Sequence, residues 1–550
     1  MPLNQKKMKK NSFIGGAVFA YVALIFTKML GALYNIPFYQ LIGEKGGVIY
    51  STAYNIYAIF LDVTVCGIPS AISIVVSEYN STERFKSKTK AFTLALKYVS
   101  IVSLVFFGVL QIFAPQFAYF FIGDMTEGVS IGDIAMAIRA VSFCLLVAPI
   151  LSVTRGYLSG HKYISASSTS QVIEQIVHVS LVLGGVFAAV HLMNLSTTIG
   201  VCVALVSTAV GAVTGLIYLI TKAANNREEL FSKDRTEDKC DSNAVILKKI
   251  ISYCLTLTIV SIAQSVYSLV DMKLLLVGLH NLNFSDEATQ VIASVNSTWT
   301  PKISMIIAAL AMGMVSSIAP HMAENYARGE MDKVSEKLNQ AVGTTLIISI
   351  PLSIGIMVYA EPTYRFFYGA SDYGANVLML SVIINTLGNV ATVISMTMQS
   401  INRGKTVCVV TVIGILLNMV FDLPWIYLFD RIGIPAYLGA CVSSIFAQLI
   451  TSILLLAYLK KTMNFDYRGI FSAFLRIIPA AIAMCLVIIG MKRLWPVADG
   501  RNLMLVVHLG AVAVVGAAVY LPVSYLTGAL TMTIGGGFVD RILIKLHLKK

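Results

Sequence analysis

The stretch TTIGVCVALVSTAVGAVTGLIYLIT, residues 197–221, has no charged side chain anywhere along it. The hydrocarbon core of a bilayer is about 30 Å thick, so a helix needs about 20 mostly apolar residues to cross it. Inside that core, backbone amides must find their hydrogen-bond partners within the helix itself. The stretch therefore predicts a membrane-spanning α-helix.

Similar stretches recur along nearly the whole chain. Of its 550 residues, 57% are hydrophobic and 13% are charged, and the mean hydropathy is +0.78. This composition leaves too little polar surface for a water-soluble globule. The sequence predicts an all-α polytopic membrane protein with about 14 transmembrane helices. We expect them near residues 12–42, 48–78, 91–113, 133–153, 164–190, 197–221, 250–279, 300–322, 338–359, 375–400, 406–428, 437–459, 470–491 and 503–527.

The formal net charge of +13 has an uneven distribution, because most of the basic residues fall in every second gap between the predicted spans. The positive-inside rule explains that alternation, and it places both termini in the cytoplasm without any nucleic-acid partner. The basic gaps contain Lys6–Lys10, Arg84–Lys90, Arg155 with Lys162, Lys222–Lys249, Arg328–Lys337, Arg403 with Lys405, Lys460–Arg468 and Arg541–Lys550.

Two pairs of related segments indicate an internal duplication. Gly67–Glu78 aligns with Gly313–Glu324, and Thr154–Lys162 aligns with Thr397–Lys405 at an almost equal offset. Each half would hold six spans, so the repeats are expected to be parallel. The predicted domains are a six-helix lobe at 1–221, a cytoplasmic linker at 222–249, a second six-helix lobe at 250–460, and two further helices with a cytoplasmic tail at 461–550.

Three segments carry a family resemblance: Lys28–Pro37, Gly67–Ile72 and Ser170–Val177. Together with the two lobes and the two extra helices, they resemble the polysaccharide transporter branch of the multidrug/oligosaccharidyl-lipid/polysaccharide flippase superfamily. The likeness to stage V sporulation protein B-like proteins and Gram-positive lipid II flippases covers essentially the whole chain.

The resemblance implies a bacterial plasma-membrane flippase that acts as a monomer. Its substrate would be an undecaprenyl-pyrophosphate-linked saccharide, with the peptidoglycan precursor lipid II as the first expectation. It would work by alternating access, and cell-wall synthesis enzymes would be possible partners. The alternatives are a flippase for another lipid-linked polysaccharide unit and a cation-coupled multidrug exporter of the same superfamily.

Charged and polar residues inside the spans mark the candidate site, because each charge is costly in the bilayer unless it faces a cavity or a partner. Lys28 could meet a pyrophosphate as a compact cation, or it could form an ion pair with Asp62. Glu174 and Gln175 share a polar patch with His178, which could serve either substrate contact or helix packing. The predicted substrate-binding residues are Lys28, Tyr34, Asp62, Glu174, Gln175 and Lys273.

The span 1 and span 2 positions differ from the family pattern. Gram-negative lipid II flippases carry two arginines in the first span and one in the second, where this chain has Lys28 and Tyr34, then Leu61 and Asp62. A single cation in place of a cluster leaves the identity of the glycan open.

A second set of residues suggests cation coupling. Asn418 and Asp422 lie four positions apart on one helix face, which offers oxygen ligands to a hard cation or a carboxylate to a proton. Lipid II flippases of known architecture are similar here, with a sodium site built from three helices of the second lobe. The expected residues are Asp271, Asn418, Asp422 and Ser444, and the ion would be Na⁺ or H⁺. Alternatively, Asp422 marks the outer interface, because Pro424 and Trp425 follow it closely.

No enzymatic activity and no cofactor are expected. The sequence has no Walker A, G-x-S-x-G or H-E-x-x-H motif, and the predicted external loops are short. The eight cysteines show no C-x-x-C spacing and fall mostly in apolar windows, so they are expected to pack rather than to bind metal or form disulfides.

Overall fold

The computed structural model describes residues 13–123, 128–231, 240–305, 307, 322, 325–326, 328–401, 403–497, 500 and 503–535. Within these ranges the regular structure is helical, with no strand, and twelve helical segments are long and apolar enough to cross a membrane. The predicted all-α polytopic class is therefore confirmed.

The predicted count of fourteen spans is not established. Residues Val22–Ser81, which cover the first two predicted spans, form one helical run with breaks in it. Most of the predicted span at 300–322, together with most of the repeat segment Gly313–Glu324, lies outside the described residues.

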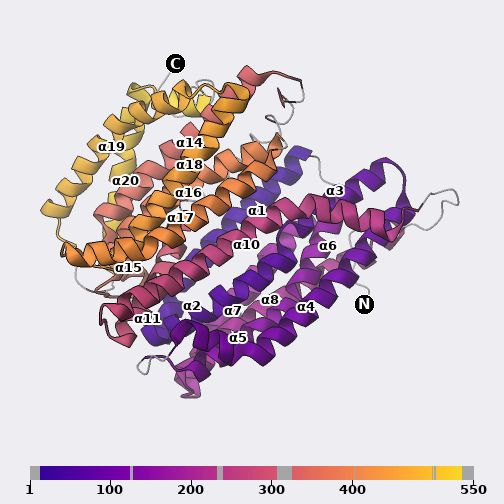
Figure 1. The fold of residues 1–550 in the computed structure, drawn as a ribbon, viewed down its shortest axis with the longest axis horizontal. Coiled ribbons are helices and arrows are strands. Elements are labelled where there is room, and N and C mark those ends of the chain that lie inside the picture. The colour runs from indigo at the N-terminus through magenta and orange to yellow at the C-terminus, as the bar shows by residue number, and fades with distance from the viewer. Residues whose placement is uncertain are drawn as a thin grey trace. The chain divides into compact units, whose positions relative to one another are not determined.

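The helices pack into two compact units, and Figure 1 shows their order by colour. The first unit comprises Met1–Leu276 and Asn283–Ser294. Its elements are α1 (Phe13–Leu33), α2 (Asn35–Val65), α3 (Ile68–Ser81), α4 (Phe85–Ile122), α5 (Ile131–Ser142), η1 (Phe143–Leu146), α6 (Ala148–Gly160), α7 (Ile164–Phe187), η2 (Ala188–Leu192), α8 (Thr197–Ala224), α9 (Arg227–Leu230), most of α10 (Asn243–Asn281) and α11 (Asp286–Ser294).

The second unit comprises Val277–Leu282 and Val295–Lys550. Its described elements are the end of α10, η3 (Val295–Trp299), α14 (Met331–Val358), α15 (Ala360–Tyr368), α16 (Gly374–Ser400), α17 (Gly404–Arg431), α18 (Leu438–Met463), α19 (Arg468–Leu494), α20 (Leu503–Leu526) and η4 (Thr531–Gly535). The two extra helices, α19 and α20, pack on each other and on α14, where the Tyr520 hydroxyl donates to the Ile347 carbonyl at 2.9 Å.

The packing places the division between the units later in the chain than the predicted linker at 222–249. The linker region contains the end of α8, α9 and the start of α10, and α10 belongs to the first unit as far as Leu276. The division into lobes at 221 and 250 rests on the sequence repeat and stays a prediction.

Glycine residues decide where the helices of the first unit break and where they touch. Gly67 has φ +75°, a left-handed conformation that glycine tolerates best, and it separates α2 from α3. Pro69 follows in the first turn of α3, where proline costs no hydrogen bond. On α6, a Cβ at Gly156 would lie 2.6 Å from the Pro69 carbonyl oxygen, so the backbones of α3 and α6 can meet only because this position is glycine.

Candidate functional site

The first unit contains a partly buried ion pair between α6 and α7. Arg155 donates from Nη2 to Oε2 of Glu174 at 2.5 Å and from Nε to Oγ of Ser170 at 2.8 Å. The helix α8 approaches this pair closely at Gly215, where a Cβ would lie 3.5 Å from Arg155 Nη2. The guanidinium is thus held by two residues of α7, both of them in the family-typical segment 170–177.

The end of α1 and the turn that follows it contact α7 within the next turn of that helix after Glu174. A Cβ at Gly31 would lie 3.5 Å from the amide nitrogen of Gln175, and the ring of Tyr34 meets the ring of His178 edge-on at 5.5 Å. Lys28 lies one helical turn before Gly31 and is exposed. The structure therefore brings Tyr34, Gln175 and Glu174 to one region of the first unit, with Lys28 on the adjoining turn of α1.

Asp62 lies near the end of α2 and accepts a hydrogen bond from the hydroxyl of Ser265 on α10. Further contacts continue the pairing in antiparallel register. The Thr258 hydroxyl donates to the Cys66 carbonyl at 2.8 Å, and Asn55 approaches the sulfur of Met272 at 3.7 Å. Ser261 also contacts Cys66, at 2.7 Å. Asp62 is thus part of the contact that holds α10 to α2, and α10 is the helix that carries Asp271 and Lys273.

Lys273 points toward the end of α4. Its Nζ donates to the Phe121 carbonyl at 3.1 Å and lies 5.4 Å from the centre of the Phe120 ring. The last carbonyls of a helix have no partners within the helix and carry a partial negative charge, so a lysine there is favourable. This placement gives Lys273 a structural contact.

In the second unit, α17 and α18 bring three of the four predicted cation-site residues into a buried region. The side-chain amide of Asn418 donates to the hydroxyls of Ser443 and Ser444, each at 3.3 Å, and the Ser443 hydroxyl donates to the Asn418 carbonyl at 3.1 Å. Asp422, one turn along α17, is fully buried. The side-chain oxygen of Asn418 is buried without a hydrogen-bond partner among the described residues.

The fourth predicted residue, Asp271, is buried on α10 and belongs to the first unit. Among the described residues no group of three or more His, Cys, Asp or Glu side chains is placed to hold a metal ion. The four-residue site therefore stays a prediction. The burial of Asp422 does argue against its assignment to a solvated outer interface.

Sequence reasoning missed two features. Arg155 was expected in a cytoplasmic gap but lies inside α6, and nothing local to it signals a partner 19 positions away. Asp241, just before α10, was assigned only to the linker.

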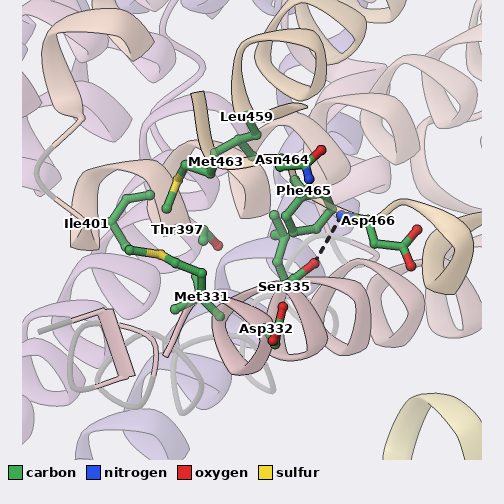
Figure 2. Close-up of a pocket in the computed structure, with 12 residues that line it drawn as sticks. Met331, Asp332, Ser335, Thr397, Ile401, Leu459, Met463, Asn464, Phe465 and Asp466 are labelled. Carbon is green, nitrogen blue, oxygen red and sulfur yellow. Dashed lines mark hydrogen bonds between the residues drawn. The ribbon is translucent and has the colours of Figure 1, made fainter. Parts of the chain in front are cut away.

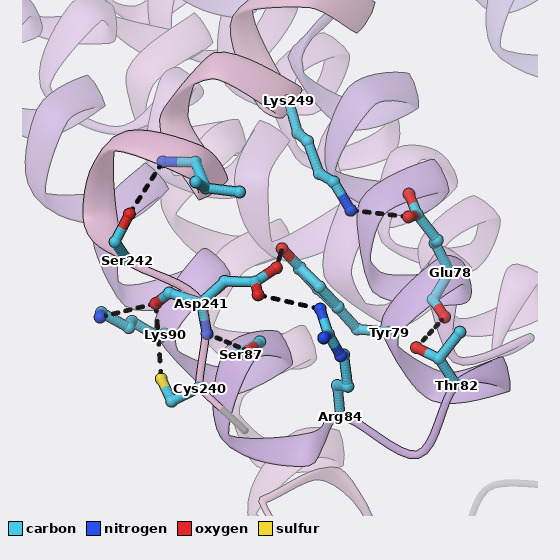
Figure 3. A network of polar contacts seen from close by, with 11 residues as sticks. Glu78, Tyr79, Thr82, Arg84, Ser87, Lys90, Cys240, Asp241, Ser242 and Lys249 are labelled. Atoms are coloured by element: carbon cyan, nitrogen blue, oxygen red, sulfur yellow. Dashed lines mark hydrogen bonds and ion pairs between the residues drawn. The ribbon is translucent and has the colours of Figure 1, made fainter. Parts of the chain in front are cut away.

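Figure 3 shows Asp241 at the centre of a polar network with the end of α3 and the start of α4. Its carboxylate accepts from the Tyr79 hydroxyl at 2.8 Å and from Arg84 at 2.9 Å. Its backbone nitrogen donates to Ser87 at 2.9 Å, and its carbonyl accepts from Lys90 at 3.0 Å. The first turns of α10 are therefore fastened to the first unit.

Two further contacts strengthen the same end of the first unit. Lys249 forms an ion pair with Glu78 at 2.6 Å. The Tyr163 hydroxyl, between α6 and α7, donates to Glu229 of α9 at 2.5 Å. Burial, together with this hydrogen bond to a carboxylate, raises the pKa of the Tyr163 phenol above its ordinary value.

A small cavity of about 60 Å³ lies in the second unit where the start of α14 meets the ends of α16 and α18, and Figure 2 shows its lining. Asp332 and Asp466 belong to that lining, and the Asp466 backbone nitrogen donates to Ser335 at 3.3 Å. The volume is about that of two water molecules, too little for a saccharide or a lipid.

The comparisons with known proteins agree with this architecture. Residues 14–280 match the model of the family described as "Polysaccharide biosynthesis protein", and residues 257–423 match the MatE family model. Lipid II flippase MurJ of Bacillus subtilis (strain 168) is 27% identical over 520 residues, which are 92% of this chain and 94% of that protein. Stage V sporulation protein B of the same organism is 28% identical over 175 residues, 32% of each chain.

A solved structure titled "Lipid II flippase MurJ, inward closed conformation" has a TM-score of 0.67 at 16% identity and covers 93% of this chain and 99% of that one. The twelve apolar helices of the described residues, taken with these relatives, indicate a multi-pass membrane transporter. The two family models and these relatives support membership of the multidrug/oligosaccharidyl-lipid/polysaccharide flippase superfamily, which the sequence segments predicted. Its relatives are transporters and flippases, which agrees with the prediction that it is not an enzyme.

Proposed function

We propose that this protein moves an undecaprenyl-pyrophosphate-linked saccharide from the inner to the outer leaflet, and that lipid II is its substrate. One observation carries the proposal: the similarity to a lipid II flippase extends over 94% of that protein's length. The partial match to stage V sporulation protein B leaves two processes that the proposed transport would serve, vegetative growth and sporulation.

The proposed contact for the pyrophosphate is Lys28. It lies in a helix that begins the membrane-spanning run, and its side chain is exposed. A cation at that depth is tolerated where it faces a hydrated cavity or a partner, and a lysine ammonium suits a phosphate as a compact charge. Tyr34, between α1 and α2, and Gln175, on α7, would add hydrogen-bonding groups for the saccharide.

The proposed energy source is a sodium or proton gradient that acts through α17. Asn418 offers a buried side-chain oxygen, Asp422 a buried carboxylate and Ser444 a hydroxyl. Oxygen ligands of this kind suit a hard cation, and a buried carboxylate also suits a proton.

The experiment that tests the function is rescue of a bacterium depleted of its own lipid II flippase, with outer-leaflet lipid II as the readout. Rescue by the natural chain, loss with Lys28→Ala and partial recovery with Lys28→Arg would support the proposal. Lys97→Ala is the matched control, because Lys97 is also an exposed lysine within a spanning helix of the first unit. No rescue from a chain confirmed in the membrane would contradict lipid II as the substrate.

A second candidate function is cation-coupled drug export, which the MatE match over residues 257–423 favours. Drug resistance in an exporter-deficient host, lost with Asp422→Asn and unaffected by Lys28→Ala, would support export over lipid transport.

A further inference from the structure

A surface hollow of about 420 Å³ lies on the second unit, along the last three turns of α18. Its apolar wall is formed by Ile453, Leu456 and Ala457, and Lys460, Lys461 and Tyr467 line the rest. Positions 453, 456, 457 and 460 share one face of the helix. The hollow shares no lining residue with the small cavity of Figure 2. Its volume falls in the range of small-molecule sites, about 300–1,000 Å³.

The position of the hollow relative to the membrane follows from the chain itself. The span α18 ends at Met463 and the next span begins at Arg468, so Lys460 and Lys461 lie at a membrane surface. Ile453 lies seven residues earlier, about 10 Å deeper at 1.5 Å per residue. Charge at the surface and an apolar wall below it match the two parts of a phospholipid.

Tyr467 gives the hollow a fixed side wall. It precedes α19, and its hydroxyl donates back to the Leu456 carbonyl. The Nζ of Lys460 lies 5.4 Å from the centre of the Tyr467 ring. Tyrosine is favoured at membrane interfaces because its ring is apolar and its hydroxyl is polar.

The two lysines differ from three basic side chains of the first unit in how their charges are neutralised. Lys249, Arg84 and Arg155 each meet a carboxylate. Within the part of the chain that the structure describes, neither Lys460 nor Lys461 forms an ion pair, and no acidic residue lines the hollow. The carboxylate of Asp466, close by in sequence, accepts from the Arg468 backbone nitrogen instead.

We propose that this hollow binds one anionic phospholipid, with its phosphate between Lys460 and Lys461 and an acyl chain along Ile453, Leu456 and Ala457. The pattern of basic residues places this end of α18 on the cytoplasmic side, where anionic lipids attract lysines. The site is separate from the proposed substrate contacts, which lie in the first unit. It would bind lipid whichever substrate the protein carries.

The test compares lipids retained by the purified full chain, using native mass spectrometry with phosphatidylglycerol and phosphatidylcholine of identical acyl chains. The natural protein should retain one phosphatidylglycerol with about thirtyfold preference, as expected for two lysines at an anionic headgroup. Lys460→Gln with Lys461→Gln should abolish the preference. Ala457→Trp, which fills the hollow but keeps both lysines, should abolish it as well.

The matched control is Lys222→Gln, because Lys222 also lies in the last turn of a span, 5.7 Å from a tyrosine ring, but lines neither cavity described here. It should keep the preference, and higher salt should weaken it in both proteins. Equal retention of the two lipids, or full retention by Ala457→Trp, would overturn the proposal. Competition by glycerol phosphate alone would overturn it in favour of a simple anion site. Displacement by undecaprenyl phosphate at lower concentration would overturn it in favour of a substrate entry site.

Discussion

Arg84 and Asp241 lie 157 positions apart, and the Arg84 guanidinium donates to the Asp241 carboxylate at 2.9 Å. The contact joins the turn between α3 and α4 to the residues just before α10 (Figure 3). Because α10 also contacts α2 through Ser265 and Asp62, it is fixed to the first unit at its start and along its length. The positions of Asp271 and Lys273 therefore depend on contacts outside their own helix turn.

We expect Asp241→Asn to destabilise the protein by about 1–3 kcal/mol, because hydrogen bonds to a charged acceptor lose that amount when the charge is removed. Unfolding by SDS in mixed micelles measures the change. Glu361→Gln is the control, since Glu361 is itself 56% exposed and pairs with Arg365 four positions along the same helix, and pairs with a solvent-exposed partner contribute less. An equal loss of unfolding free energy in the two variants would show that the Asp241 network stabilises the protein no more than the Glu361–Arg365 pair does.

The pair of Arg155 and Glu174 should couple strongly. Glu174→Ala leaves a mostly buried guanidinium without its carboxylate, so we expect a loss of about 3 kcal/mol, less than for a fully buried pair because Glu174 is 26% exposed. Removing both partners, with Arg155→Ala added, should cost less than the sum of the single changes. A double-mutant cycle measures this, and strict additivity would mean that the ion pair contributes nothing.

Two glycines in neighbouring helices should respond in opposite directions to alanine. Gly156→Ala places a methyl group 2.6 Å from the Pro69 carbonyl oxygen, and such overpacking costs about 1–3 kcal/mol. Gly108→Ala meets no atom within 4 Å inside α4 and should stabilise by up to about 1 kcal/mol through helix propensity. Equal stability of both variants in the same unfolding assay would contradict close packing of α3 on α6.

The sequence predicts the spanning helices well because burial in lipid is a property of the local window. The predicted spans at 406–428 and 437–459 lie within α17 (Gly404–Arg431) and within one residue of α18 (Leu438–Met463). The breaks are harder to predict. Gly67 is one of 39 glycines, and nothing in its apolar window distinguishes a left-handed residue from a helical one.

Polar partners were only partly predictable. Asn418 and Asp422 share a helix face by spacing alone, and a serine of the next span was expected beside them. The pairing of Arg155 with Glu174 depends on how α6 returns against α7, which periodicity does not specify. The same holds for Lys273, whose partner is the last turn of α4.

The proposed cation coupling leads to a prediction that does not need transport. An ion that binds only the folded protein raises its stability, so sodium should raise the melting temperature above its value in potassium at equal ionic strength. Asn418→Ala removes the buried side-chain oxygen and should reduce that difference, and Asp422→Asn should abolish it. Asn376→Ala is the control, because Asn376 is another asparagine of the second unit and bonds only Tyr437 through its amide.

The same variants separate the two candidate ions. If a proton is the coupling ion, sodium will have no effect on the natural chain, and Asp422→Asn will instead remove a dependence of transport on pH. If neither sodium nor pH distinguishes Asp422→Asn from the natural protein, the carboxylate on α17 is a buried structural group and the gradient acts elsewhere. We expect one of the first two results, because Asp422 is fully buried one turn from the buried side-chain oxygen of Asn418.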